Sequence, residues 1–162
     1  MPGMPTTETT QPHADLKGPG YRAMSALSRA THELPLDPLV RELIRVRASM
    51  LNGCAYCVDM HTKDARAIGE TEQRLYAIST WHEAPFFSPA ERAALALTDA
   101  FTLLAGNPPP DAVIADAERE LGAEGLASAM WIIVTINAWN RVDDRRARAR
   151  RRVRARRLSA RC

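Results

Sequence analysis

Long apolar runs and cysteines are both scarce in this chain of 162 residues. No apolar run reaches the roughly 18 residues or more that a membrane-spanning helix needs, and the first twenty residues lack the basic and then apolar pattern of a secretory signal. Three cysteines are too few for the disulfide-stapled scaffold of a small secreted protein. We therefore expect a cytoplasmic protein that does not enter a membrane.

Strand patterns are missing as well, because apolar and polar residues nowhere alternate convincingly. Apolar residues instead recur at helical spacing, and the periodic stretches stop at glycine, proline or capping residues. Asp37 before Pro38 and the capping box from Ser88 to Glu91 mark two clear helix starts. The expected helices begin near residues 21, 38, 54, 71, 89, 111 and 125. The sequence therefore predicts an all-α bundle of about six to seven helices.

The last of these helices, residues 125–140, is apolar on most of its sides. A helix of this kind needs burial all round, either at the centre of a domain or between subunits. We therefore expect the protein to be an oligomer.

Charge is distributed unevenly along the chain, although the formal net charge is only +3. Residues 141–162 hold 11 basic and two acidic side chains, a net charge of +9, whereas residues 1–140 hold 11 basic and 17 acidic ones, a net charge of −6. We divide the chain into an N-terminal segment (1–20), a helical domain (21–141) and an arginine-rich tail (142–162). Both terminal segments are expected to be disordered.

The arginine-rich tail could neutralise the phosphates of a nucleic acid. However, no aromatic residue lies among its arginines to stack on bases, and its large apolar residues are limited to Val142, Val153 and Leu158. We therefore expect no nucleic-acid partner. Our hypothesis is that the tail comes from a shifted reading frame or a recent replacement of the end of the last helix.

Two cysteines three positions apart, Cys54 and Cys57, are followed by His61. On a helix, positions i, i+3 and i+7 share one face, with neighbouring β-carbons about 5–6 Å apart. Asn52-Gly53 interrupts the preceding helical pattern, so Cys54 should lie at a helix start, where free N–H groups and the helix dipole favour a thiolate. A second nearby cysteine can condense with a sulfenic acid to form a disulfide. The pattern predicts thiol redox chemistry, with His61 as a candidate base or proton relay.

Other interpretations of the cysteine pair remain open. Cys54, Cys57, His61 and Glu42 could supply four zinc ligands, or the cysteines could be an inert buried pair. Structural zinc sites usually collect ligands from separate loops, and the chain has no second cluster of cysteine and histidine. It also has no nucleotide or flavin fingerprint. We therefore favour thiol chemistry without a bound metal or cofactor.

Motifs around the cysteines continue through much of the chain. They are Glu42 with Cys54-Ala-Tyr-Cys57-Val-Asp-Met-His61, then Gly69-Glu-Thr-Glu-Gln-Arg-Leu, Trp81-His-Glu-Ala-Pro-Phe-Phe-Ser and Ile136-Asn-Ala-Trp-Asn-Arg141. Together they resemble the core of the alkylhydroperoxidase AhpD family, over roughly residues 20–141. Carboxymuconolactone decarboxylases share this fold but lack the paired cysteines, so the cysteines distinguish the two branches.

The resemblance implies an all-helical subunit that assembles into trimers or hexamers and runs a thiol-dependent peroxidase cycle. Cys57 would attack an alkyl hydroperoxide, Cys54 would resolve the product, and Glu42 and His61 would relay protons. A dithiol, either a lipoyl-bearing protein or a small thiol, would reduce the oxidised pair. The resemblance implies no bound cofactor.

The chain departs from the best-studied AhpD branch at Tyr56, where that branch has a histidine between the cysteines. Part of that branch's proton relay is therefore absent. The helix-start argument also favours Cys54 over Cys57 as the more acidic thiol, which is opposite to the order that the resemblance implies. A non-redox enzyme of the decarboxylase type and a non-catalytic redox-responsive module remain the alternatives.

Overall fold

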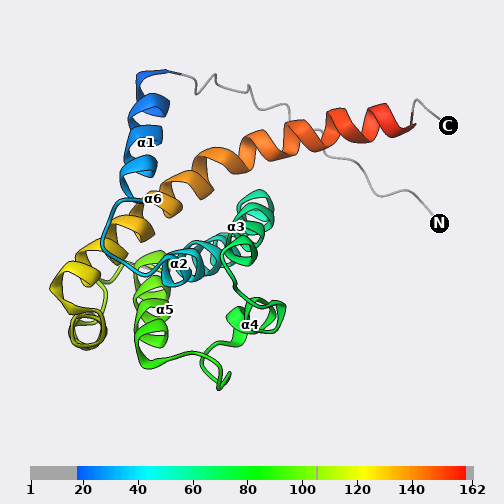
Figure 1. Ribbon diagram of the computed structural model, residues 1–162. Helices are drawn as coiled ribbons and strands as arrows, with labels where there is room; N and C mark the ends of the chain where they lie inside the picture. The colour runs from blue at the N-terminus through cyan, green and yellow to red at the C-terminus, as the bar shows by residue number, and fades with distance from the viewer. Residues whose placement is uncertain (1–17, 105, 160–162) are drawn as a thin grey trace.

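The computed structural model describes residues 18–104 and 106–159, with side chains described up to Val142. Helices account for most of these residues, which contain no strand. In chain order the elements are α1 (Pro19–Ala30), α2 (Pro38–Leu51), α3 (Ala55–Ala67), α4 (Glu72–Ala77), the 3₁₀ helix η1 (Ile78–Thr80), α5 (Pro89–Thr102) and α6 (Asp111–Ser159) (Figure 1). The predicted all-α bundle is confirmed.

Capping residues account for where α2 and α5 begin. The Asp37 carboxylate accepts hydrogen bonds from the N–H groups of Leu39 (2.7 Å) and Val40 (3.3 Å). At α5, the side chains of Ser88 and Glu91 each accept a hydrogen bond from the backbone N–H of the other residue. These bonds satisfy N–H groups that a helix start leaves without partners. Both predicted caps are confirmed.

α2 packs against α3, α5 and α6 and occupies the middle of the bundle (Figure 1). Leu43 and Val46 on this helix belong to one hydrophobic cluster, shared with η1 and α5. Val40 and Ile44 belong to a second cluster, shared with α5 and α6. Because α2 is enclosed on more than one side, its polar side chains are held in fixed positions inside the protein.

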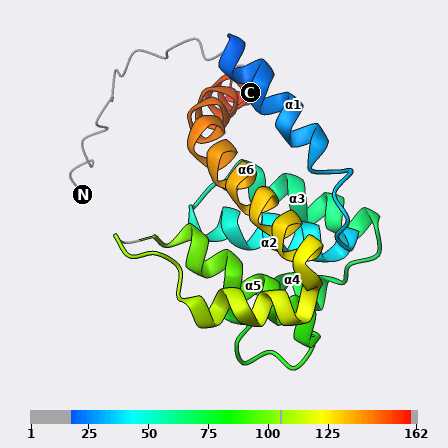
Figure 2. The same ribbon diagram turned by 90° about the vertical axis from the view of Figure 1, so that its left-hand side faces the viewer.

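α6 consists of two helical segments that meet at Gly122. This glycine has φ 72° and ψ 168°, a conformation that is essentially restricted to glycine. Figure 2 shows the shorter first segment turning into the long second one. The two predicted helices, 111–121 and 125–140, therefore exist, but a single residue joins them in place of a short loop.

The second segment of α6 is buried on one side and exposed on another. Ala129, Ile132 and Ile133 pack into the core, whereas Trp131 and Val134 are 54% and 48% exposed. Between Asp111 and Val142, α6 is long and apolar enough to cross a membrane by length and composition alone, a test that core helices of soluble proteins also pass. Its packing leads us to interpret it as a core helix.

The expected disorder of the arginine-rich tail stays a prediction. α6 continues as a helix to Ser159. Residues 142–159 contain no glycine or proline and are rich in arginine and alanine, which have high helix propensities. Residues 1–17 and 160–162 lie outside the described residues, and so does most of the N-terminal segment for which we expected disorder.

Candidate active site

The two motif cysteines lie around the start of α3, directly after the tight turn that ends α2. Gly53 has φ 67°, in the left-handed region that glycine adopts readily. The N–H of Cys54 donates to the carbonyl oxygen of Ser49 (3.0 Å), and Cys54 Sγ accepts from the N–H of Cys57 (3.4 Å). Cys54 is the N-cap residue of α3, so its predicted place at a helix start is confirmed.

A network of amide side chains joins this turn to α6. Asn52 Nδ2 donates to Oδ1 of Asn137 (2.9 Å) and to Oδ1 of Asn140 (3.0 Å). Asn140 Nδ2 in turn donates to Ser49 Oγ (3.0 Å), and the carbonyl of Ser49 holds the N–H of Cys54. The position of the cysteine pair therefore depends on side chains from the far end of the domain.

Cys54 and Cys57 form a disulfide with a Cα–Cα distance of 5.4 Å. Both residues are buried, at 0% and 1% exposure. The pair is thus seen in the oxidised state that thiol redox chemistry requires. While this bond exists, neither sulfur is a thiolate, so the four-ligand zinc site considered from the sequence cannot form in this state.

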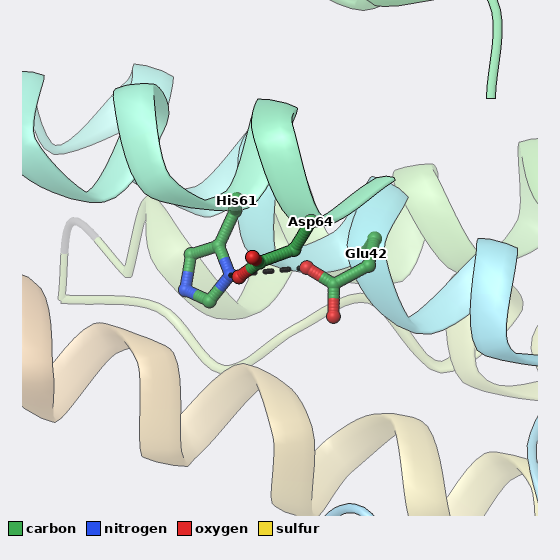
Figure 3. A group of neighbouring side chains, drawn as sticks. All are labelled: Glu42, His61 and Asp64. Carbon is green, nitrogen blue, oxygen red and sulfur yellow. Dashed lines mark hydrogen bonds and ion pairs between the residues drawn. The ribbon is translucent and has the colours of Figure 1, made fainter. Parts of the chain in front are cut away.

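His61 on α3 and Glu42 on α2 form a buried pair (Figure 3). His61 Nδ1 lies 3.0 Å from Glu42 Oε2, and the two side chains are 10% and 8% exposed. Asp64, one turn further along α3, places Oδ2 3.7 Å from the same nitrogen, but its side chain is largely exposed. The structure therefore brings together the two predicted residues of the relay and adds Asp64, which was not predicted.

The environment of Glu42 determines which nitrogen of His61 carries hydrogen. Burial alone would raise the pKa of the Glu42 carboxyl. The hydrogen bond to His61 and the charge of Arg45 lower it by more than burial raises it, so the pKa lies below its usual value. Glu42 is then a carboxylate at neutral pH and can only accept hydrogen bonds. His61 Nδ1 must be the donor, which leaves Nε2 of the neutral ring as the basic nitrogen.

Arg45 was not among the predicted site residues. Its Nη1 forms an ion pair with Glu42 Oε1, and its Nη2 donates to Thr31 Oγ1 (3.1 Å). Its side chain is only 6% exposed. The sequence offered one sign of this ion pair, the position of Arg45 three residues after Glu42. That spacing is common between charged residues on helix surfaces, so it does not identify a site residue.

A pocket of about 350 Å³ lies between α1, α2, α3 and α6. Cys57, His61 and Arg45 are among the described residues that line it, whereas Cys54 is not. Apolar and aromatic side chains complete much of the wall, namely Tyr21, Met60, Ile132, Ile136 and Trp139. This volume falls in the range that holds small organic ligands.

Glu42, His61 and Asp64 could also hold a metal ion. Donor atoms of Glu42, His61 and Asp64 all lie within 4.8 Å of one another. However, the guanidinium of Arg45 is bonded to Glu42, and its positive charge would repel a cation at that carboxylate. The arrangement therefore fits acid–base chemistry better than metal binding.

Comparisons with known proteins agree with this geometry. The model of the carboxymuconolactone decarboxylase family matches residues 19–100. The uncharacterised protein YdfG of Bacillus subtilis (strain 168) is 41% identical over 124 residues, which cover 76% of this chain and 84% of YdfG. The uncharacterised protein YnjA of Escherichia coli (strain K12) is 35% identical over 66 residues, 41% of this chain and 36% of YnjA.

A crystal structure shares the fold as well. It is that of ATU0492 from Agrobacterium tumefaciens, a protein of unknown function and a candidate antioxidant defence protein AhpD. The two structures match with a TM-score of 0.74 at 35% identity, over 77% of this chain and 86% of that one. Fold, family model and relatives agree, and the chain therefore belongs to the carboxymuconolactone decarboxylase family, with an AhpD-like helical fold.

Proposed function

We propose that the protein is a thiol-dependent hydroperoxide reductase that cycles between a Cys54/Cys57 dithiol and the corresponding disulfide. The observation that supports this best is the disulfide itself, with Cys57 lining a pocket that also contains His61. His61 is bonded to the buried carboxylate of Glu42. Two sulfurs, a base and a cavity for a substrate thus lie together.

Cys57 is the cysteine that we assign to the attack on peroxide, because it lines the pocket and Cys54 does not. His61 Nε2 takes the proton from the Cys57 thiol, and the thiolate attacks one peroxide oxygen. A sulfur–oxygen bond forms and the oxygen–oxygen bond breaks, which gives a sulfenic acid and an alkoxide. The protonated His61, stabilised by Glu42, then gives its proton to the alkoxide, and an alcohol leaves.

Cys54 completes the oxidation. Its sulfur attacks the sulfur of the Cys57 sulfenic acid, the disulfide forms, and the oxygen leaves as water. The Cα–Cα distance of 5.4 Å lies within the normal range for a disulfide, so closure needs no large backbone movement. Resolution by Cys54 would protect Cys57 from irreversible oxidation by further peroxide.

A dithiol donor must return two electrons to the disulfide. One donor thiol attacks to form a mixed disulfide, and the second thiol then releases the reduced protein. We propose a lipoyl-bearing protein or a small dithiol as this donor, and the cytoplasm, which keeps thiols reduced, as the compartment.

The test is peroxide consumption by the reduced protein supplied with dihydrolipoamide, with free thiols counted before and after. We expect turnover that disappears in Cys57→Ser, and a loss of two thiols per oxidised subunit. Equal turnover by Cys57→Ser, or thiols that peroxide leaves unchanged, would contradict the proposal. A non-redox reaction of the decarboxylase type would instead survive replacement of either cysteine.

We further propose that the subunit forms a homotrimer or homohexamer. Trp131 and Val134 are exposed apolar residues three positions apart on α6, so they share one face of that helix. Exposed apolar patches commonly mark interaction sites. Light scattering should give a trimer or hexamer for the wild type and smaller species for Trp131→Arg. A monomeric wild type would contradict this proposal.

A further inference from the structure

Arg45 belongs to a buried chain of hydrogen bonds that runs from the end of α1 to His61. The hydroxyl of Thr31 donates to the carbonyl oxygen of Ser28 (2.7 Å) and accepts from Arg45 Nη2 (3.1 Å). Arg45 Nη1 is paired with Glu42 Oε1, and His61 Nδ1 lies 3.0 Å from the other oxygen, Oε2. Each carboxylate oxygen of Glu42 therefore has its own partner, which fixes the orientation of the group.

The protonation of Glu42 decides what His61 can do. A buried carboxylate without a cationic partner is costly and tends to take up a proton. A protonated Glu42 could donate to His61 Nδ1, and the neutral ring would then carry its hydrogen on Nε2. That tautomer presents a donor to the pocket in place of a base, so it could not accept the proton of a thiol.

We propose that Arg45 is a positioning residue of this site: it fixes the Glu42 carboxylate so that His61 carries hydrogen on Nδ1 and presents Nε2 to the pocket. The kinetic consequence rests on the proposed peroxidase function. The position of the hydrogen on His61 is independent of that function, and it can be measured even if the protein has no peroxidase activity.

Other charged groups near the pair do not replace Arg45. Asp64 is negative and largely exposed. Burial lowers the pKa of His32, as do the charges of Arg45 and Arg41, so His32 is neutral near pH 7. Arg41 donates to backbone carbonyls of the α1–α2 connection, including that of His32 (2.8 Å).

The first experiment measures the tautomer of His61 by ¹⁵N NMR near pH 7, with the signals assigned by comparison with His61→Gln. In the wild type we expect hydrogen mainly on Nδ1. In Arg45→Met we expect the form with hydrogen on Nε2 to become the major one. Arg45→Gln also removes the charge and has the same expected outcome if the methionine variant does not fold. Retention of the Nδ1–H form in a folded variant overturns the proposal.

Arg47→Met is the matched control for a lost buried ion pair. Arg47 lies on the same helix and binds Asp99 through Nε (2.6 Å) and Nη2 (2.8 Å), away from Glu42. Its removal should lower the stability of the protein but leave the His61 tautomer as in the wild type. A tautomer change as large as that of Arg45→Met would show that general loosening, not the contact to Glu42, is responsible.

The second experiment measures the rate of Cys57 oxidation in Arg45→Met, in Glu42→Gln and in the double variant. We expect Arg45→Met to be slower by about tenfold or more, a part of the 10²- to 10⁴-fold that positioned acid–base groups contribute. Because Arg45 acts through Glu42, the double variant should be no slower than Glu42→Gln. Losses that multiply in the double variant overturn the proposal. A wild type that consumes no peroxide refutes the proposed function, whereas the NMR result still decides the role of Arg45.

Discussion

Nδ1 of His61 lies 3.0 Å from Oε2 of Glu42, and this contact links α3 to α2 inside the protein. The two residues are nineteen positions apart in the sequence. Because a proton taken up by Glu42 would remove its charge and exchange donor and acceptor in this contact, both the fold and the proposed chemistry depend on pH.

Replacement of Glu42 should change how stability depends on pH. The folded-state pKa of Glu42 lies below its unfolded value of about 4.5. The ionised group therefore stabilises the fold at higher pH, and this contribution is lost as pH falls through the folded pKa. We expect Glu42→Gln to cost about 1–3 kcal/mol near pH 7, because Arg45 loses its charged partner, and the cost to shrink toward pH 3. Urea unfolding between pH 3 and 7 measures this.

Glu91 provides the control for that experiment. Burial alone would raise the pKa of Glu91, but hydrogen bonds from Arg74 and Ser88 lower it by more than burial raises it. Glu91, like Glu42, therefore stabilises the fold when it is ionised, and this contribution is lost in acid. Glu91→Gln should therefore also flatten the pH dependence, but without changing the His61 tautomer. If the free energy of unfolding varies with pH as little in the wild type as in Glu42→Gln, then Glu42 does not make stability depend on pH.

The two cysteine variants should respond differently to peroxide. Because Cys57 lines the pocket, Cys54→Ser should still form a sulfenic acid, and this species should persist without a resolving thiol. Cys57→Ser should form little or none at residue 54. Labelling with dimedone followed by mass spectrometry identifies the modified residue. A sulfenic acid found mainly at Cys54 would support the helix-start argument and reverse the proposed roles.

Reduction of the disulfide should destabilise the fold modestly. The bond closes a very short loop, because the cysteines are three positions apart. The loop-entropy relation then gives about 2 kcal/mol for its contribution to the free energy of unfolding. Urea unfolding with and without a phosphine reductant measures the difference. The double variant Cys54→Ser/Cys57→Ser should show no effect of the reductant, and a wild type that is equally insensitive would contradict the prediction.

Replacement of Gly122 should destabilise the protein through the backbone of α6. Its φ of 72° and ψ of 168° lie in a region that other residues occupy at a cost of about 1–3 kcal/mol. A Cβ atom at this position would meet no atom within 4 Å, so the cost of Gly122→Ala comes from the backbone and not from a clash. Gly20→Ala is the control, because it also has open space but lies within α1 without a positive φ. Thermal unfolding should show a lower midpoint for Gly122→Ala alone.

Local signals in the sequence were sufficient for most of the fold. Asp37 and the pair Ser88 and Glu91 satisfy N–H groups within three residues, so their capping roles follow from neighbours in the chain. The end of α6 was not predicted, because the composition of the tail suggested a solvated segment while its arginines and alanines also favour a helix. Composition and helix propensity gave opposite answers there.

The site was predictable only where its residues follow a local pattern. The cysteines and His61 share one helical pattern, and the relay role of Glu42 came from the family resemblance. Arg45 and Thr31 were missed, because a hydrogen bond between residues fourteen positions apart leaves no periodic trace in the sequence. The structure brought them together by placing the end of α1 beside α2.

The bond from Asn52 to α6 has a consequence for anyone who would graft the redox motif onto a designed scaffold. Residues 42–61 are contiguous and look portable, since they hold both cysteines, the histidine and the glutamate. The Asn52 amide donates to the carbonyl of Ala48 within this segment (2.9 Å), but its other acceptors are Oδ1 atoms of Asn137 and Asn140 on α6. A transplanted segment would keep its reactive groups but lose the contacts that fix its turn to α6, so a working graft must carry a matching piece of α6 with it.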